Sequence, residues 1–232
     1  MIEIRPFAGL GHANHGWLDA HHHFSFADYW NPARQNFGAL RVWNDDHIAP
    51  QSGFGPHPHK DMEIVTYVRK GAITHQDNQG NVGRTAAGDV QVMSAGTGIV
   101  HAEYNREAEA TEIFQIWIEP TRKGLPPRWE NRQFPPASRD GALQAVASGE
   151  PQHAAAAPIV ADATLYAATL SAGQQTTHTL APGRRAYLVS ARGRVAINGQ
   201  VAQPRDGVAI SAETLLNLQA IDEAEILLFD LP

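Results

Sequence analysis

Short runs of β-branched and aromatic residues, separated by glycine, asparagine and aspartate, recur along most of the 232 residues. Runs of this composition favour β-strands, and the residues between them are typical of tight turns. No stretch shows the sustained helical spacing of apolar residues that an amphipathic helix requires. The sequence therefore predicts an all-β protein, and its many short strands indicate a sandwich or jelly roll.

The expected strands form two sets, one in each half of the chain. The first set comprises residues 2–7, 37–46, 63–68, 90–93 and 114–118, with a hairpin tip at residues 77–81. The second set comprises residues 165–170, 185–189, 194–197, 208–210, 215–218 and 225–229, with a hairpin at Asn198-Gly199. The glycine- and histidine-rich segment between residues 9 and 30 is expected to be loop with aromatic anchors.

A proline-rich stretch separates the two sets. Seven of the 15 prolines lie between Glu119 and Pro158, and proline fixes φ and removes an amide donor. This stretch is therefore expected to be a linker with short helical turns and one edge strand at residues 143–147. We place a domain boundary within it, so that residues 1–137 form one domain and residues 138–232 form a second.

Composition excludes several classes of function. Cysteine is absent, which excludes disulfides, thiolate metal ligands and cysteine nucleophiles. The net charge is −6 and no basic cluster exceeds Arg184-Arg185, so neither nucleic acid nor a membrane surface is an expected partner. No apolar run reaches the roughly 18 residues of a membrane span, and the amino terminus does not resemble a secretion signal. We expect a cytoplasmic protein.

Two pairs of residues have the spacing of metal ligands. Residues two apart in an extended chain point to the same face, which pairs His57 with His59 and His101 with Glu103. Three imidazoles and one carboxylate suit iron, nickel, copper or zinc, and four donors leave coordination positions free for a substrate. Glu63 shares strand parity with the first pair if the strand stays regular, so it competes for the carboxylate role. Ten of the 12 histidines precede residue 102, so we expect one metal, in the first domain.

Other polar and aromatic residues receive simpler interpretations. The three consecutive histidines at residues 21–23 cannot all bind one ion, because neighbours in a strand point to opposite faces, and they are expected in a surface or pocket-rim loop. His75 is expected to be exposed near a hairpin tip. Asn105 is expected to be a turn or hydrogen-bonding residue. Aromatic lining for the site is expected from Phe24, Phe26 and Phe114.

Both ligand pairs lie inside recognisable motifs. The segments HPHKDMEIVTYV and SAGTGIVHAEYN, together with a histidine-poor second half, resemble the two motifs of cupins and, more specifically, the pirin family of bicupins. Ser94 in place of the usual proline departs from the general cupin pattern, as do two stretched spacings, and pirins share such departures. The resemblance covers essentially the whole chain. It implies two jelly-roll cupin barrels in tandem, of which only the first binds metal.

The resemblance also implies a ligand set and an activity. Pirins take their carboxylate ligand from the second motif, which selects Glu103 and leaves Glu63 as a supporting residue, base or salt-bridge partner. The HGWLDAHHHFSFADYW opening is similar to bacterial pirins associated with quercetin 2,3-dioxygenase activity, in which a metal-bound flavonol is cleaved by dioxygen with release of carbon monoxide. We expect Fe(II), with Zn, Ni, Cu, Mn and Co as alternatives. The expected ligands of this single ion are His57, His59, His101 and Glu103, and Glu103 is also the expected catalytic base.

Two other classes of function stay open. Pirins in animals are linked to transcription-factor complexes, so a metal- or redox-sensing binding protein that acts through a protein partner is the first alternative. A different metal-dependent cupin reaction, such as isomerisation or hydrolysis, is the second. The dioxygenase is expected to be a monomer whose partners are a small aromatic flavonol and dioxygen. Oxygen uptake with a flavonol would separate it from both alternatives.

Overall fold

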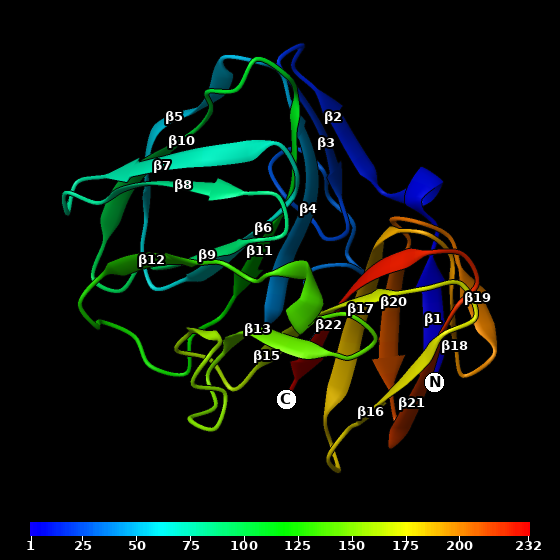
Figure 1. Cartoon of the computed structure of the whole chain (residues 1–232). Coiled ribbons are helices and arrows are strands. Elements are labelled where there is room, and N and C mark those ends of the chain that lie inside the picture. Colours follow the sequence, from blue (N-terminus) through cyan, green and yellow to red (C-terminus); the bar gives the residue numbers. More distant parts are fainter.

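All 232 residues are described by the computed structural model, and the all-β prediction is confirmed. The chain forms 22 strands and two short 3₁₀ helices, η1 (Phe7–Gly9) and η2 (Pro136–Ser138), and no α-helix. The strands build two sandwiches that lie side by side (Figure 1). Neither helix is long and apolar enough to cross a membrane.

The first sandwich combines a seven-stranded sheet with a four-stranded sheet. Across the larger sheet the strands are, in order, β12 (Arg128–Arg132), β9 (Val90–Ser94), β6 (Glu63–Lys70), β11 (Thr111–Ile118), β4 (Leu40–Ile48), β3 (Leu18–His22) and β2 (Gly11–Asn14). Across the smaller sheet they are β5 (Ser52–His59), β10 (Ile99–Asn105), β7 (Ala72–Asp77) and β8 (Val82–Ala86). All neighbouring strands in this sandwich are antiparallel.

The second sandwich has the same arrangement of a seven-stranded and a four-stranded sheet. Its larger sheet consists of β1 (Ile2–Arg5), β20 (Gly207–Ser211), β17 (Arg185–Arg192), β22 (Ala224–Leu231), β15 (Thr164–Leu170), β13 (Gln144–Ser148) and β14 (Ala157–Pro158). Its smaller sheet consists of β16 (Gln175–Thr179), β21 (Leu215–Ala220), β18 (Val195–Ile197) and β19 (Gln200–Ala202). The antiparallel pair β18 and β19 is the hairpin predicted at Asn198-Gly199.

The first strand of the chain belongs to the second sandwich. β1 pairs antiparallel with β20, from Ile2 opposite Ile210 to Arg5 opposite Gly207, and Figure 1 shows this strand among those of the second half. The division into residues 1–137 and 138–232 does not foresee this exchange. For the rest of the chain we retain that boundary as a proposal, because β12 joins the first sandwich and β13 joins the second.

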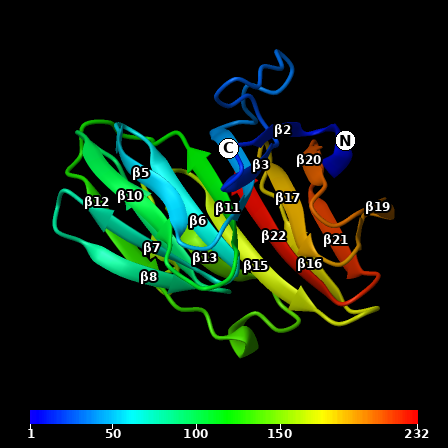
Figure 2. The ribbon, with the colours of Figure 1, turned by 90° about the horizontal axis from the view of Figure 1, so that it is seen from above.

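The two sandwiches pack against each other through their larger sheets. The largest apolar cluster contains 25 buried residues and draws on both halves, including Trp43 of β4, Phe114 of β11, Tyr187 of β17 and Phe229 of β22. Figure 2 shows these strands at the junction between the halves. Burial of large aromatic side chains on this scale favours one fixed arrangement of the two sandwiches.

The interiors of the two sandwiches differ in chemistry. A cluster of 16 buried apolar residues, among them Leu188, Ile210 and Leu228, fills the second sandwich. The first sandwich contains apolar clusters of only six and four residues, and it also buries polar side chains such as His101 and Glu103. Buried polar side chains are unfavourable without partners, so the first sandwich is the one built around a site.

Two segments differ from the sequence-based expectation. The region between residues 9 and 30, expected to be loop, contains the hairpin of β2 and β3 at the edge of the larger sheet. In β3, Leu18, Ala20 and His22 are buried and the residues between them are half-buried. This alternation is typical of a strand, but the histidine and glycine content of the segment resembles that of a loop. The proline-rich stretch contains β12, which pairs with β9, as well as the expected strand near residues 143–147.

Candidate metal centre

Three of the predicted ligands converge between β5 and β10. His57 lies directly opposite His101 in the antiparallel register, and the two-residue spacing along β5 places His59 on the same face as His57. The ring centroids of the three histidines are separated by 4.4 to 5.0 Å. One nitrogen from each ring lies within 4.8 Å of the other two. The structure thus brings together the three histidines that the sequence singled out.

In His57 and His101, Nδ1 makes the hydrogen bond of the ring, and Nε2 is left free to bind a metal. Nδ1 of His57 lies 2.8 Å from the carbonyl oxygen of Gly55, so Nδ1 carries the proton and Nε2 carries the lone pair. Nδ1 of His101 lies 3.4 Å from Nδ1 of His75, and Nε2 of His101 is buried without a hydrogen-bond partner. A buried nitrogen without a partner is unfavourable, and a metal ion would satisfy it.

A buried histidine–aspartate pair supports His101. Nε2 of His75 lies 2.9 Å from Oδ2 of Asp77, and both side chains are fully buried. Because a carboxylate only accepts, His75 donates from Nε2 and accepts the Nδ1 proton of His101 at its own Nδ1. This chain of hydrogen bonds fixes His101 in the tautomer that presents Nε2, as is usual for metal-binding histidines.

The burial of His75 overturns the expectation that it is exposed. The turn at residues 77–81 is a hairpin tip between β7 and β8, as expected. His75 lies two residues before this turn, opposite Glu103 in the pairing of β7 with β10. Its ring also stacks on Trp129, with centroids 4.6 Å apart and planes 6° from parallel. His75 is therefore part of the site's support.

Two histidines of the site, His59 and His101, are neutral near pH 7. Burial, reinforced by the neighbouring His57, lowers the pKa of His59 to about 4. Burial, reinforced by the other two histidines, lowers the pKa of His101 to about 2. Neutral imidazole is the form that binds a metal, so these groups are ready to bind without losing a proton first.

Glu103 is a fully buried carboxylate held by three neutral side chains. Gln91 donates from Nε2 to Oε1 at 2.5 Å, and Thr66 donates from Oγ1 to the same oxygen at 3.5 Å. Gln115 donates from Nε2 to Oε2 at 2.8 Å. Burial raises the pKa of Glu103 to about 7, although these three hydrogen bonds oppose the increase. The group can therefore both hold and release a proton near neutral pH.

The position of Glu103 relative to the histidines is asymmetric. One of its oxygens lies within 4.8 Å of ring nitrogens of both His75 and His101. The group formed by His57, His59 and His101 does not include it. Glu103 thus lies at the His101 side of the site, and its binding to the metal stays a prediction.

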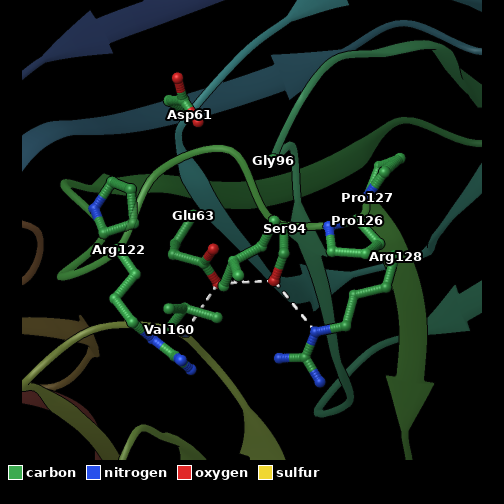
Figure 3. A pocket seen from close by; sticks show the side chains of 11 residues that line it. Asp61, Glu63, Ser94, Gly96, Arg122, Pro126, Pro127, Arg128 and Val160 are labelled. Atoms are coloured by element: carbon green, nitrogen blue, oxygen red, sulfur yellow. Dashed lines mark hydrogen bonds between the residues drawn. The ribbon is translucent and has the colours of Figure 1, made fainter.

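Glu63, the competing carboxylate, lies in a different cavity (Figure 3). Its Oε2 accepts hydrogen bonds from Oγ of Ser94 at 2.7 Å and from the backbone N–H of Val160 at 3.0 Å. The cavity has a volume of about 400 Å³, and no histidine lines it. β5 ends at His59, and Asp61 adopts a left-handed φ of 46° before β6 begins. This turn breaks the alternation on which the placement of Glu63 with the histidines depended.

Aromatic rings border the histidines, but not all of those expected. Trp117 stands edge-on to His59 with centroids 4.9 Å apart, and Phe26 stands edge-on to Trp117 at 5.4 Å. The expectation that Phe24 and Phe114 line the site is wrong, because both are buried in the apolar cluster between the sandwiches. Phe114 of β11 and Phe24, in the bend that follows β3, therefore pack between the sandwiches and not beside the histidines.

The remaining polar residues have structural partners. Nδ2 of Asn105, the last residue of β10, donates to the carbonyl oxygens of Ile48, Ala49 and Glu109, so of its two expected roles it has the hydrogen-bonding one. The second sandwich contains no group of three potential metal ligands. Its His178 is paired with Asp230, with Nε2 and Oδ2 2.8 Å apart.

Comparison with known proteins identifies the family. The Pirin family model matches residues 4–118, and the model of the quercetinase C-terminal cupin domain matches residues 145–231. A Pseudomonas aeruginosa relative, named as a candidate quercetin 2,3-dioxygenase, is 61% identical over 230 residues, which is 99% of each chain. The chain belongs to the pirin family. The two sandwiches are therefore the N-terminal and C-terminal cupin domains of a pirin.

Comparison with Escherichia coli proteins, by sequence and by structure, extends this finding. A protein named quercetin 2,3-dioxygenase is 44% identical over 243 residues, covering 100% of this chain and 99% of the relative. The crystal structure of the bacterial pirin YhhW in complex with nickel(II) matches with a TM-score of 0.94 and 45% identity, covering 100% of this chain and 99% of that chain. A pirin of the same fold thus binds a transition metal.

Proposed function

We propose that this pirin is a metal-dependent dioxygenase that cleaves a flavonol such as quercetin. The observation that carries the proposal is the buried, partnerless Nε2 of His101 beside the convergent rings of His57 and His59. The name of the E. coli relative supports the choice of substrate class. We propose that these three histidines and Glu103 hold one divalent ion per chain.

The donor set fits a borderline divalent metal. Three imidazoles and one carboxylate suit Fe(II), which we propose as the resident ion, and they also accept Ni, Zn, Cu, Mn or Co. When bound, such an ion supplies a Lewis acid that favours the deprotonated flavonol and a template that holds it beside dioxygen. All other steps fall to the side chains of the cupin domain.

Glu103 is the proposed base for the flavonol hydroxyl. In the metal-free protein its pKa of about 7 is close to the value that lets a general base accept and release a proton near neutral pH. The amide groups of Gln91 and Gln115 hold one carboxylate oxygen each, so the carboxylate keeps its orientation when it takes the proton. Glu103 would serve in turn as ligand and base.

An aromatic wall would position the planar substrate. Trp117 contacts His59 directly, and Phe54 lies 6.4 Å from the ring of His57. Nε1 of Trp117 donates to Oε1 of Gln115 at 3.2 Å, and Gln115 in turn donates to Glu103. Apolar rings beside a few polar groups are typical of small-molecule sites. The same contacts would orient the flavonol and keep water from the base.

The test is oxygen uptake with quercetin, combined with detection of carbon monoxide. Metal-loaded wild type should consume one dioxygen and release one carbon monoxide per flavonol cleaved. His59→Ala and His101→Ala should abolish the activity, whereas His47→Ala, which removes an exposed histidine of β4, should retain it. Equal rates in metal-loaded protein, metal-free protein and ligand variants would mean that quercetin autoxidises.

We further propose that the protein acts in the cytoplasm as a monomer. The net charge of −6 without a basic cluster argues against nucleic acid and membrane partners. If metal-dependent oxygen uptake is absent, a metal- or redox-sensing pirin that acts through a protein partner becomes the favoured function. Binding of a partner that depends on the metal state would then be the measurement to make.

A further inference from the structure

The hairpin of β2 and β3 carries a second group of potential metal ligands. His12 lies directly opposite His21, and Asn14 lies opposite Asp19. Because side chains alternate along a strand, His12, Asp19 and His21 all project from one face of the hairpin. One donor atom from each of the three lies within 4.8 Å of the other two. This group shares no residue with the first centre.

His21 is held in place but lacks a polar partner. Its ring stacks on His12, with centroids 4.5 Å apart and planes 20° from parallel, and it also contacts the ring of Phe7 at 4.2 Å. Nδ1 of His21 is buried and has no hydrogen-bond partner. Arg205, a neighbouring cation, donates from Nε to Oδ2 of Asp45 at 2.5 Å. A buried imidazole nitrogen without a partner is unfavourable, and a bound ion would satisfy it.

The other two side chains are arranged for the same ion. Nε2 of His12 lies 2.6 Å from Oδ1 of Asp19, and the two side chains are 51% and 44% exposed. This contact is exposed enough to open and admit an ion between imidazole and carboxylate. Solvent would fill the positions that the three donors leave vacant. Two imidazoles and one carboxylate suit divalent transition metals.

We propose that His12, Asp19 and His21 form a second, exchangeable site for a divalent transition-metal ion such as Zn²⁺. The site lies on the hairpin face opposite Leu18, Ala20 and His22, which point into the first sandwich. It therefore faces away from the interior that holds the first centre. Its solvent exposure and three-donor set make it the weaker of the two, so purified protein would retain one ion after dialysis.

The test is equilibrium dialysis of tag-free protein against Zn²⁺, with elemental analysis. Wild type should bind two ions with separable affinities. His12→Gln and His21→Gln should each weaken binding of the second ion and leave binding of the first unchanged. The loss should exceed roughly 10- to 100-fold, which is the typical loss in metal affinity when a residue that only supports a ligand is mutated. His15→Gln, which changes an exposed histidine of the same hairpin loop, should bind both ions like wild type.

Imidazole resonances provide a measurement that needs no variant. In wild-type protein, the ring signals of His12 and His21 should shift together as the second equivalent of Zn²⁺ is added, while the signals of His15 stay in place. A second equivalent that persists in both glutamine variants, a wild type that binds only one ion, or unshifted signals of His12 and His21 would each overturn the proposal. None of these results depends on dioxygenase activity.

Discussion

Replacing Asp77 by asparagine should weaken metal binding, although Asp77 is not a ligand. In the wild type, Oδ2 accepts from His75 and from Nδ2 of Asn81, each at 2.9 Å, while Oδ1 accepts from the backbone N–H groups of Gln79 and Asn81 at 2.9 and 3.0 Å. The backbone donors cannot become acceptors, whereas Asn81 can turn its amide and His75 can change tautomer, so the new amide should keep its oxygen on the backbone side and turn its NH₂ group toward His75. His75 would then accept at Nε2 and donate from Nδ1 toward His101.

The exchanged donor and acceptor roles of His75 affect the proposed ligand His101 through the hydrogen bond between their Nδ1 atoms. His101 can accept at Nδ1 only when its own proton sits on Nε2, the nitrogen proposed to bind the metal. Metal binding would then leave two buried N–H groups facing each other. An unsatisfied buried polar group costs about 1–3 kcal/mol, and each 1.4 kcal/mol is about tenfold in affinity. We therefore expect affinity to fall by about 10- to 100-fold.

The assay is an anaerobic competition titration of Ni²⁺ or Fe(II) against a coloured chelator. Asp89→Asn is the matched control, because Asp89 also accepts a backbone N–H, from Phe134 at 3.1 Å, but contacts no histidine. Thermal unfolding of both variants in chelator tests whether the metal-free fold is intact. A folded Asp77→Asn variant that binds metal within about a factor of two of wild type, or about 0.4 kcal/mol, would refute the reasoning. Equal losses in both variants would also refute it.

The two buried carboxylates give the remaining predictions. Glu103→Gln should weaken metal retention, because a charged ligand oxygen becomes a neutral amide oxygen. It should also abolish turnover in the protein that retains metal, because the amide cannot act as a base. Full metal retention by elemental analysis would exclude Glu103 as a ligand. Glu63→Gln should leave metal occupancy unchanged, because Glu63 is bonded to Ser94 in a separate cavity; lost occupancy would return the ligand role to Glu63. In metal-free protein, burial raises the pKa of Glu103 from 4.5 to about 7. The folded state therefore binds this proton more tightly than the unfolded chain, and the stability that Glu103 contributes falls as pH rises through this window. Glu103→Gln, which does not titrate, should gain up to about 3 kcal/mol relative to wild type between pH 4.5 and 7; parallel pH profiles in urea unfolding would contradict this.

Local rules explain which parts of the site could be predicted from the sequence. Alternation along a strand is a property of neighbouring residues, so the spacing of His57 and His59 was sufficient to place them on one face. The same rule placed His101 on the inner face of β10. It failed for Glu63, because the turn at Asp61 interrupts the strand and an aspartate with a left-handed backbone has no distinctive local signature.

Non-local pairing explains most of what the sequence did not reveal. The burial of His75 depends on the register of β7 against β10, which no short segment specifies. One signal was available, since Asp77 follows His75 by two residues and must share its face in a strand. The hairpin of β2 and β3 was concealed by its glycine and histidine content, which resembles a loop, until its pairing with β4 is known.

The exchange of β1 into the second sandwich constrains the order in which the protein folds. Residues 2–5 leave the ribosome before their partners at residues 207–211, which follow only after roughly 10 to 40 seconds at typical rates of synthesis. During that interval the first cupin domain can fold, but Ile2 and Ile4 lie in a segment that has no strand to pair with. A fragment comprising only residues 138–232 would permanently lack this strand and expose the edge of β20, which invites pairing with other chains. The second cupin domain is therefore complete only when residues 2–5 pair with residues 207–211.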